Sequence, residues 1–425
     1  MTELPGSGTL AGDVLAGVDL RRRVVTNTFA QLVAPVLRAG VGVALFAILG
    51  RYLGVAGFGE YGVVIAYVLL FTNALGDWGL ATILVREISR RPAERPTLIA
   101  SATALQLALA AASYVAILAI ALFSSYSADV RSSLALFGLT LLLAPVQMLS
   151  AHFATDLRLT RLVPPAVAGT VTQLVLTVVA VALHGPLLAI IAANTLSVCV
   201  EMGWSALIVL RELRFGRPTL APWGLFLGES WPLAIATLLA TAAKQAPLLL
   251  LSSVGMDAVG IFAAATKIPD YLSRIPYAFR TTMFPLLSRR WHERDGFTPL
   301  VARTVGGTLG LTAPIAVAGI VAAPWIVSLV FGRSFAGAAL PFAALMIAFV
   351  LVSLGVLLES ALVAADGQRV DLVIRASASA LLLVLLALLA PTLGATGSAL
   401  AVAVAAGVTV VLMLVVLRQR ARSVT

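Results

Sequence analysis

Long apolar runs, separated by short polar breaks, follow one another along almost the whole chain. An apolar helix of about 20 residues can cross roughly 30 Å of hydrocarbon, where a helix satisfies its own backbone polar groups. The short alternating segments typical of a transmembrane β-barrel do not occur in this sequence. The pattern therefore predicts an all-α polytopic membrane protein with twelve transmembrane helices. The expected spans are residues 24–50, 58–80, 97–123, 132–155, 162–183, 186–210, 224–252, 257–288, 298–320, 336–364, 371–390 and 394–417.

Two spans carry additional expectations. The eighth, at 257–288, is too long for a simple crossing and contains Pro269 and Pro276. We therefore expect it to tilt, to kink at its prolines or to extend into the cytoplasm. Gly306 and Gly310, in the ninth span, are expected to permit close packing of helices.

Composition and charge agree with a membrane protein. Hydrophobic residues make up 60% of the chain and charged residues 11%, which leaves too little polar surface for a soluble protein of this length. The net charge of +10 would suggest nucleic acid in a soluble protein, but cytoplasmic loops of membrane proteins collect Lys and Arg. With the N-terminus inside, twenty basic residues fall in inside segments, three in outside loops and six within spans. This bias predicts both termini in the cytoplasm and no nucleic-acid partner.

Residues that would support catalysis or cofactor binding are sparse. The single Cys199 lies in a hydrophobic run, and the three histidines have no metal-ligand spacing. The glycines of Gly57–Gly62 spell G-x-G-x-x-G, but no expected strand precedes them, so a dinucleotide site is not indicated. We expect no catalytic residues, no metal and no cofactor, and hence a protein that is not an enzyme.

A repeat relates the two halves of the chain. The segments Leu53–Gly62 and Val254–Ala263 align at an offset of 201 residues, which places Gly59 opposite Gly260. Both segments are expected outside, so the halves share one topology, as in transporters built from parallel repeats. The predicted organisation is a cytoplasmic tail at 1–22, a six-helix lobe at 23–210, a cytoplasmic linker at 211–223, a second six-helix lobe at 224–418 and a cytoplasmic tail at 419–425.

Several short motifs, in this order and spacing, resemble those of Wzx-type polysaccharide flippases in the multidrug/oligosaccharidyl-lipid/polysaccharide exporter superfamily. They are Arg51–Gly62, Gly76–Leu80, Val85–Arg90, Phe284–Ser288, Phe331–Gly332 and Gly367–Arg369, and the resemblance covers about residues 22–418. It implies two pseudo-symmetric six-helix lobes around a central cavity, as in MATE transporters, in the inner membrane of a bacterium or archaeon. The implied substrate is an undecaprenyl-diphosphate-linked oligosaccharide, with membrane lipids and a polysaccharide polymerase as partners. Peptidoglycan-precursor flippases of this superfamily usually have fourteen spans, so twelve favour an exopolysaccharide, capsule or O-antigen-like unit.

Charged residues inside the spans are the candidate site. Charges at membrane depth are costly and by default indicate function. The only two lysines, Lys244 and Lys267, lie roughly 12 and 15 Å from the outer ends of their spans, and Arg38 lies near the middle of the first span. Together with Arg274 they are candidate ligands of a diphosphate, because phosphate oxygens accept hydrogen bonds from ammonium and guanidinium groups. The alternative is that each cation is paired internally or reaches an interface.

Three carboxylates are candidates for ion coupling or gating: Asp270, Glu201 and Asp77. Asp270 precedes Arg274 by four residues, so the two either form an ion pair or separate when Asp270 titrates during transport. Glu201, midway along its span, either couples an ion or pairs with a neighbouring helix. Other charged residues near the inside ends are expected to form gate or interface pairs or to lie at headgroup level: Asp77, Glu229, Arg280, Arg303 and Glu359.

The leading hypothesis is a flippase that moves a lipid-linked oligosaccharide by alternating access through a cationic cavity. The main alternative is an ion-coupled multidrug exporter of the same superfamily, although drug cations favour acidic cavities. A membrane-embedded glycosyltransferase or polymerase is a third reading, but such enzymes need large outside loops, and the expected outside loops are short.

Overall fold

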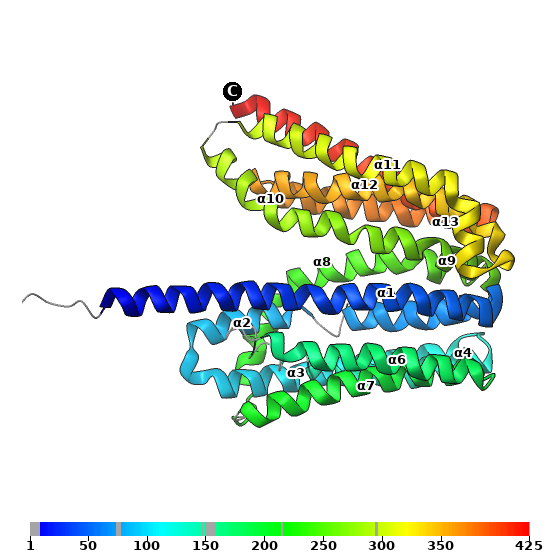
Figure 1. Ribbon diagram of the computed structural model, residues 1–425, viewed down its shortest axis with the longest axis horizontal. Coiled ribbons are helices and arrows are strands. Elements are labelled where there is room, and N and C mark those ends of the chain that lie inside the picture. The colour runs from blue at the N-terminus through cyan, green and yellow to red at the C-terminus, as the bar shows by residue number, and fades with distance from the viewer. Residues whose placement is uncertain are drawn as a thin grey trace, which may run out of the picture. The chain divides into compact units, whose positions relative to one another are not determined.

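The chain is helical throughout the computed structural model, which describes residues 9–73, 78–146, 148, 153, 159–213, 216–293 and 296–424 (Figure 1). No strand occurs in these residues. The α-helices and short 3-10 helices (η) are, in order, α1 (Thr9–Phe71), α2 (Leu80–Arg90), η2 (Pro92–Glu94), α3 (Arg95–Phe123), α4 (Ala128–Gly138), η3 (Leu139–Leu143), η4 (Leu159–Leu162), α6 (Val163–Ala182), α7 (Leu187–Glu212), α8 (Ala221–Leu251), α9 (Met256–Leu272), α10 (Arg274–His292), α11 (Phe297–Phe331), η5 (Arg333–Ala338), α12 (Ala339–Ala364) and α13 (Gln368–Val424).

Glycine breaks the helical conformation inside the two longest helices. α1 contains Gly54 at φ 68°, and α13 contains Gly394 at φ 56°. Glycine adopts positive φ without the steric penalty that a Cβ imposes. Gly54 lies in the predicted connection between the first two spans, and Gly394 is the first residue of the predicted last span, so each of these helices holds parts of two spans.

The twelve expected spans are consistent with the helices. Eight helical stretches of the described residues are long and apolar enough to cross a membrane. Two of them, 40–71 and 368–420, contain a glycine break and therefore account for four spans. The expected span at 132–155 includes residues outside the described ones, and the one at 257–288 is divided into α9 and α10. The expected kink is thus present between Pro269 and Pro276, where missing proline N–H groups weaken the helix.

Two boundaries differ from the prediction. α11 continues to Phe331, eleven residues past the expected end at 320, because residues 321–331 are also apolar and Gly332 (φ 98°) provides the stop. The segment before Arg90, expected as part of a polar loop, forms α2. Its buried residues Leu80, Leu84 and Ile88 recur every four positions and so share one helix face.

Residue contacts divide the chain into two compact units. Unit 1 comprises the described residues of Met1–Gly42, Leu75–Ser124 and Ala135–Ala234, and unit 2 those of Val43–Ala74, Ser125–Leu134 and Ile235–Thr425. A buried cluster around Leu84, Ile99 and Phe226 packs unit 1 together. In unit 2, α12 packs against both α11 and α13, and a buried cluster around Leu358 and Met413 fills their interface (Figure 1). The lobe boundaries at 23–210 and 224–418 stay predictions.

The repeated glycines meet inside unit 2. A Cβ on Gly59 would lie 2.0 Å from the carbonyl oxygen of Met256, and a Cβ on Gly260 would lie 1.9 Å from the carbonyl oxygen of Val55. Met256 and Gly260 follow Val55 and Gly59 by the same 201 residues, so the two contacts are equivalent. A reciprocal contact of this kind is what a two-fold axis produces. The repeat in the sequence is therefore also a symmetric helix crossing in the structure, which we call the glycine crossing.

Close packing was also expected at Gly306 and Gly310, and there the expectation is wrong. A Cβ at either position would have no atom of the described residues within 4 Å. Both glycines lie on an open side of α11, whose buried residues Thr304, Thr308 and Thr312 fall on another face. Spacing of small residues alone does not say which face of a helix meets a neighbour.

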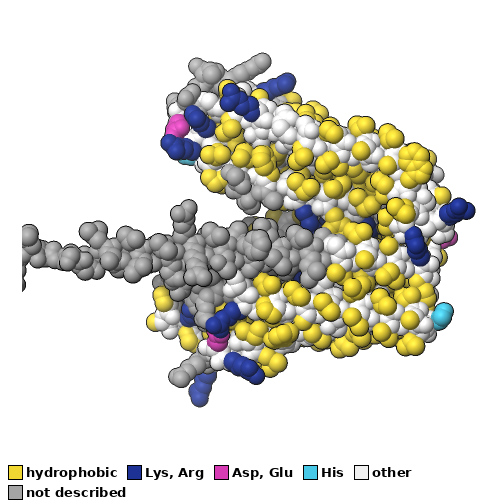
Figure 2. All heavy atoms as spheres, in the orientation of Figure 1, with side chains coloured by type: hydrophobic (Ala, Val, Ile, Leu, Met, Phe, Trp, Pro, Cys, Tyr) yellow, Lys and Arg dark blue, Asp and Glu magenta, His cyan; other side chains and the backbone are white. Residues whose placement is uncertain are grey.

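The molecular surface is apolar along the helices. Many large hydrophobic side chains are exposed in the middle of long helices, including Val115, Val321 and Leu388 at 63%, 66% and 63%. On the face shown in Figure 2, apolar side chains cover much of the visible surface, and the visible Lys and Arg side chains lie mainly toward the left and right edges of the view. Such a surface is suited to lipid rather than water, in agreement with a multi-pass membrane protein.

Candidate anion-binding site

Lys267 lies against an aromatic ring in unit 2. Residues Val259–Ala265 of α9 include a buried stripe, and Lys267 follows it half a turn later. Its Nζ lies 4.3 Å from the centroid of the Phe46 ring on α1. A cation within about 6 Å of a ring centroid is attracted to the negative face of the ring. This contact orients Lys267 without supplying a full negative charge.

Lys244 is held more loosely, by Asp270. The Nζ of Lys244 on α8 lies 3.5 Å from Oδ1 of Asp270 on α9, and the side chains are 64% and 49% exposed. The distance is longer than the 2.7–2.9 Å of a strong charge-assisted hydrogen bond. An exposed pair of this kind contributes about 0–1 kcal/mol to stability where water reaches it. Both groups thus remain accessible to another ion.

Arg274 also lies on a ring, and it is not the partner of Asp270. The helix is interrupted at Ser273, and the guanidinium carbon of Arg274 lies 5.2 Å from the centroid of the Tyr271 ring. Among the described residues Asp270 forms its ion pair with Lys244. The interruption explains why spacing along one ideal helix does not bring Asp270 and Arg274 into an ion pair.

Arg38, by contrast, is paired with a carboxylate in unit 1. Its guanidinium donates a hydrogen bond to Oε1 of Glu201 on α7, and the Glu201 side chain is 20% exposed. Gly169 of α6 makes room for this carboxylate, because a Cβ there would lie 2.7 Å from Cβ of Glu201. One turn along, Gln173 donates a 3.0 Å hydrogen bond to Asn194, so α6 and α7 share a polar seam.

The predicted site residues thus fall into two groups. Lys244, Lys267, Asp270 and Arg274 lie together on α8, α9 and the start of α10 in unit 2, whereas Arg38 and Glu201 pair in unit 1. Asp77 lies outside the described residues. Whether these groups contact a substrate or couple an ion stays a prediction.

A second charge cluster joins α10, α12 and α13. Glu359 forms ion pairs with Arg280, at 3.1 Å, and with Arg375, which also holds Asp371 at 3.0 Å. The Glu359 side chain is 13% exposed, whereas Arg280 and Arg375 are 38% and 43% exposed, so two partly exposed arginines neutralise one largely buried carboxylate. The cluster agrees with the interface pairing expected of Glu359, and Arg280 is one of its members. Its position at headgroup level stays a prediction. In unit 1 Glu229, also expected near an inside end, pairs with Arg86.

Solvated charges lie at the end of α10. There Arg289 donates a 2.7 Å hydrogen bond to Glu293 and holds the pKa of that carboxyl below its ordinary value. Both side chains are exposed, which matches the polar segment expected at the end of the eighth span. The exposed Arg289–Glu293 pair can therefore serve as a control for substitutions in the buried cluster around Glu359.

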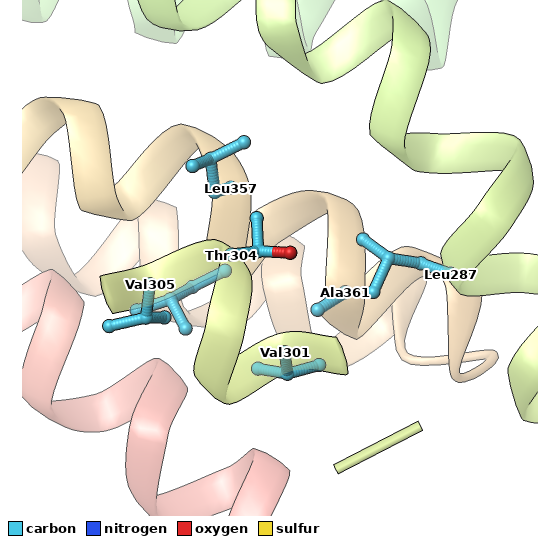
Figure 3. Close-up of a pocket in the computed structure, with 7 residues that line it drawn as sticks. Leu287, Val301, Thr304, Val305, Leu357 and Ala361 are labelled. Carbon is cyan, nitrogen blue, oxygen red and sulfur yellow. The ribbon is translucent and has the colours of Figure 1, made fainter. Parts of the chain in front are cut away.

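An apolar crevice between α10, α11 and α12 offers no charged group. It is shallow, and Figure 3 shows Leu287, Val301, Val305, Leu357 and Ala361 around Thr304. The hydroxyl of Thr304 already donates to the carbonyl of Leu300 at 2.8 Å. The crevice therefore does not compete with the cations of α8 and α9 as an anion site.

Phe46 is the residue of this site that sequence reasoning missed. It lies eight residues before Gly54, roughly 12 Å along the helix, which is a depth close to that expected for Lys267. Depth was the available signal. It did not single out Phe46, because it does not say which helix lies beside α9.

The chain is similar to one known protein family and to several solved structures. The family described as "Polysaccharide biosynthesis protein" matches residues 24–291. No curated protein sequence matches the chain. Among solved structures, the lipid II flippase MurJ in an inward closed conformation is 15% identical with a TM-score of 0.77, covering 94% of this chain and 90% of that one.

Two transporters of the MOP superfamily are also similar. An inward-facing multidrug resistance MATE family transporter is 16% identical with a TM-score of 0.72, covering 92% of this chain and 94% of that one. A transporter from Pyrococcus furiosus, described as having a binding pocket of reverse polarity that suggests a different function, is 14% identical with a TM-score of 0.56. It covers 95% of this chain and 93% of that one. At these identities the likeness shows a shared MurJ- and MATE-like fold.

Proposed function

Because the chain belongs to the polysaccharide biosynthesis protein family, we propose that it is a flippase for a lipid-linked oligosaccharide. In this proposal it moves an undecaprenyl-diphosphate-linked oligosaccharide from the inner to the outer leaflet of the cell membrane. The diphosphate binds to the cations of α8, α9 and α10 while the prenyl tail stays in lipid. No covalent step is needed.

The observation that carries the proposal is the availability of these cations. Lys267 and Arg274 contact aromatic rings, and Lys244 is more than half exposed in its long contact with Asp270. The three cations and one carboxylate give a formal charge of +2, which balances the roughly two negative charges of a diphosphate diester. By comparison, Arg38 and the arginines around Glu359 already have carboxylate partners.

The net charge that crosses the membrane also decides whether the membrane potential can drive transport. Moving two free negative charges outward would gain about 4–5 kcal/mol per 100 mV, at about 2.3 kcal/mol per charge. If the site's +2 moves with the diphosphate, this gain cancels and a coupling ion is required. Asp270, Glu201 and Asp77 remain the proposed coupling or gating carboxylates, and alternating access with both termini in the cytoplasm remains part of the proposal.

The test is glycan export in a strain that lacks its own flippase. Lys244→Ala and Lys267→Ala should each reduce export, and the double variant should abolish it at equal protein abundance, because the diphosphate loses its ammonium ligands. Arg131→Ala is the matched control, since it removes an exposed arginine of α4 that is not one of these cations. Normal export by the double variant would refute the diphosphate role.

The second candidate is an ion-coupled multidrug exporter, which the likeness to a multidrug resistance MATE transporter favours. Cationic drugs would meet repulsion at the lysines of α8 and α9. Expression in a drug-sensitive strain separates the two functions. Drug resistance that persists in the Lys244→Ala, Lys267→Ala double variant, without a glycan phenotype, would favour the exporter.

A further inference from the structure

The aromatic contact of Lys267 has a consequence for binding. We propose that Phe46 is a positioning residue for the anionic substrate, holding the Lys267 ammonium in place for a phosphate oxygen. This inference rests on the proposed function and adds a residue to its site. The ring acts through Lys267 and need not contact the substrate itself.

A ring and a carboxylate hold a cation in different ways. A carboxylate accepts hydrogen bonds in the same manner as a phosphate and would have to be displaced from the ammonium before the substrate binds. The face of Phe46, 4.3 Å from Nζ, attracts the cation without offering oxygen acceptors. The N–H donors of Lys267 that point away from the ring therefore stay available to phosphate oxygens.

Among the described residues, the nearest acidic residue on the same helix forms its ion pair with Lys244 rather than with Lys267. Asp270 lies one turn after Lys267, but its Oδ1 lies 3.5 Å from Nζ of Lys244. Arg274 repeats the arrangement of Lys267, with its guanidinium over the ring of Tyr271. Two neighbouring cations of one stretch thus lie over rings, and a ring offers no oxygen acceptor to their N–H donors.

Phe46 is itself held by a buried aromatic cluster. Its ring meets Phe58 edge-on, with centroids 6.3 Å apart and the planes at 86°. Phe58 is fully buried and lies 5.8 Å from both Phe331 and Phe335. The ring face that Lys267 contacts is therefore anchored to the core of unit 2, which holds the ammonium by a contact other than a hydrogen-bonded ion pair.

The experiment measures binding of farnesyl diphosphate to the purified full-length protein in lipid nanodiscs. Phe46→Leu keeps an apolar side chain but removes the ring, and it should weaken binding about 2- to 30-fold, the range of a cation–π contact. Phe46→Tyr keeps the ring face and should stay within about twofold of the parent. Phe123→Leu is the matched control, because the Phe123 ring is 89% exposed at the end of α3.

A double-mutant cycle distinguishes positioning from a general structural effect. In a Lys267→Gln background, Phe46→Leu should have no further effect on affinity, because there is no ammonium left to position. If Phe46→Leu folds poorly, fluorinated phenylalanines at position 46 keep the shape of the side chain while withdrawing electron density from the face of the ring. Affinity should then fall stepwise with the number of fluorines.

The outcomes separate this inference from the proposed function. If Lys267→Gln leaves affinity unchanged, the diphosphate role of Lys267 fails. If Lys267→Gln weakens binding but Phe46→Leu does not, or Phe46→Leu weakens it equally without the lysine, the positioning role is overturned and the proposed function stands. A fluorine series with constant affinity overturns it as well.

Discussion

Replacing Gly260 with alanine would place a Cβ 1.9 Å from the carbonyl oxygen of Val55 and 3.2 Å from the nitrogen of Gly59. Ordinary contact begins near 3.4 Å, so the backbones at the glycine crossing would have to separate by about 1.5 Å. Both obstacles are backbone atoms, which cannot rotate away as a side chain can. Overpacking of this kind costs about 1–3 kcal/mol, and we expect the upper part of that range.

The assay is reversible unfolding of the purified protein in detergent, with Gly306→Ala as the matched control. A Cβ at Gly306 would meet no atom of the described part of the chain within 4 Å, and alanine in a helix is favoured over glycine by about 0.5–1 kcal/mol. Gly260→Ala should therefore be destabilising and Gly306→Ala neutral or stabilising. Gly59→Ala should resemble Gly260→Ala, because the two contacts are symmetry equivalents.

Combining the two substitutions sharpens the test. One separation of the helices relieves both clashes, so Gly59→Ala with Gly260→Ala should cost less than the sum of the single changes. Full additivity would mean that the two glycines do not share one contact. If Gly260→Ala were as stable as Gly306→Ala, the reasoning about the glycine crossing would be wrong.

The same crossing and the buried charge cluster give two further predictions. In a Cys199→Ser background, Gly62→Cys with Ala263→Cys should form a disulfide on mild oxidation, because a Cβ on Gly62 would lie 3.4 Å from Cβ of Ala263, close to the usual 3.5–4.5 Å. Protection of both thiols from maleimide labelling would show the bond, and full labelling after oxidation would place the helices farther apart. Glu359→Gln should destabilise the protein by about 1–3 kcal/mol in the same unfolding assay, because two arginines, themselves 38% and 43% exposed, lose the charge of a largely buried carboxylate partner. The exposed Glu293→Gln is its control, and equal effects of the two substitutions would contradict the buried cluster.

The spans of this chain were predictable from sequence because transfer into hydrocarbon depends on local composition. The same local reasoning failed where apolar sequence continued past the end of the ninth span, and α11 extends to Phe331. It also missed α2, whose burial depends on what packs against Leu84 rather than on hydropathy. Hydropathy reports the cost of contact with water, and these two features depend on contact with protein.

The candidate site, too, has features that the sequence predicted and features that only the packing of the helices decides. Lys244 and Lys267 stood out in the sequence because a charge in an apolar run is costly wherever the helix packs. The ion-pair partners of those charges could not be predicted from the sequence, because several candidate partners lie at similar depth. Only the packing of the helices selects among them. Arg274 was the obvious partner of Asp270 by spacing, yet Asp270 pairs with Lys244 on another helix.

The sequence by itself therefore determined that this is a helical membrane protein of twelve expected spans, with an internal repeat and rare cations at depth. Those properties follow from hydrophobicity, periodicity and residue identity, which are local. Only the tertiary structure decided that Gly59 and Gly260 form one symmetric crossing and that Lys267 rests on Phe46. Phe46 and Lys267 are 221 residues apart in the chain, and a contact over that separation depends on which helices become neighbours.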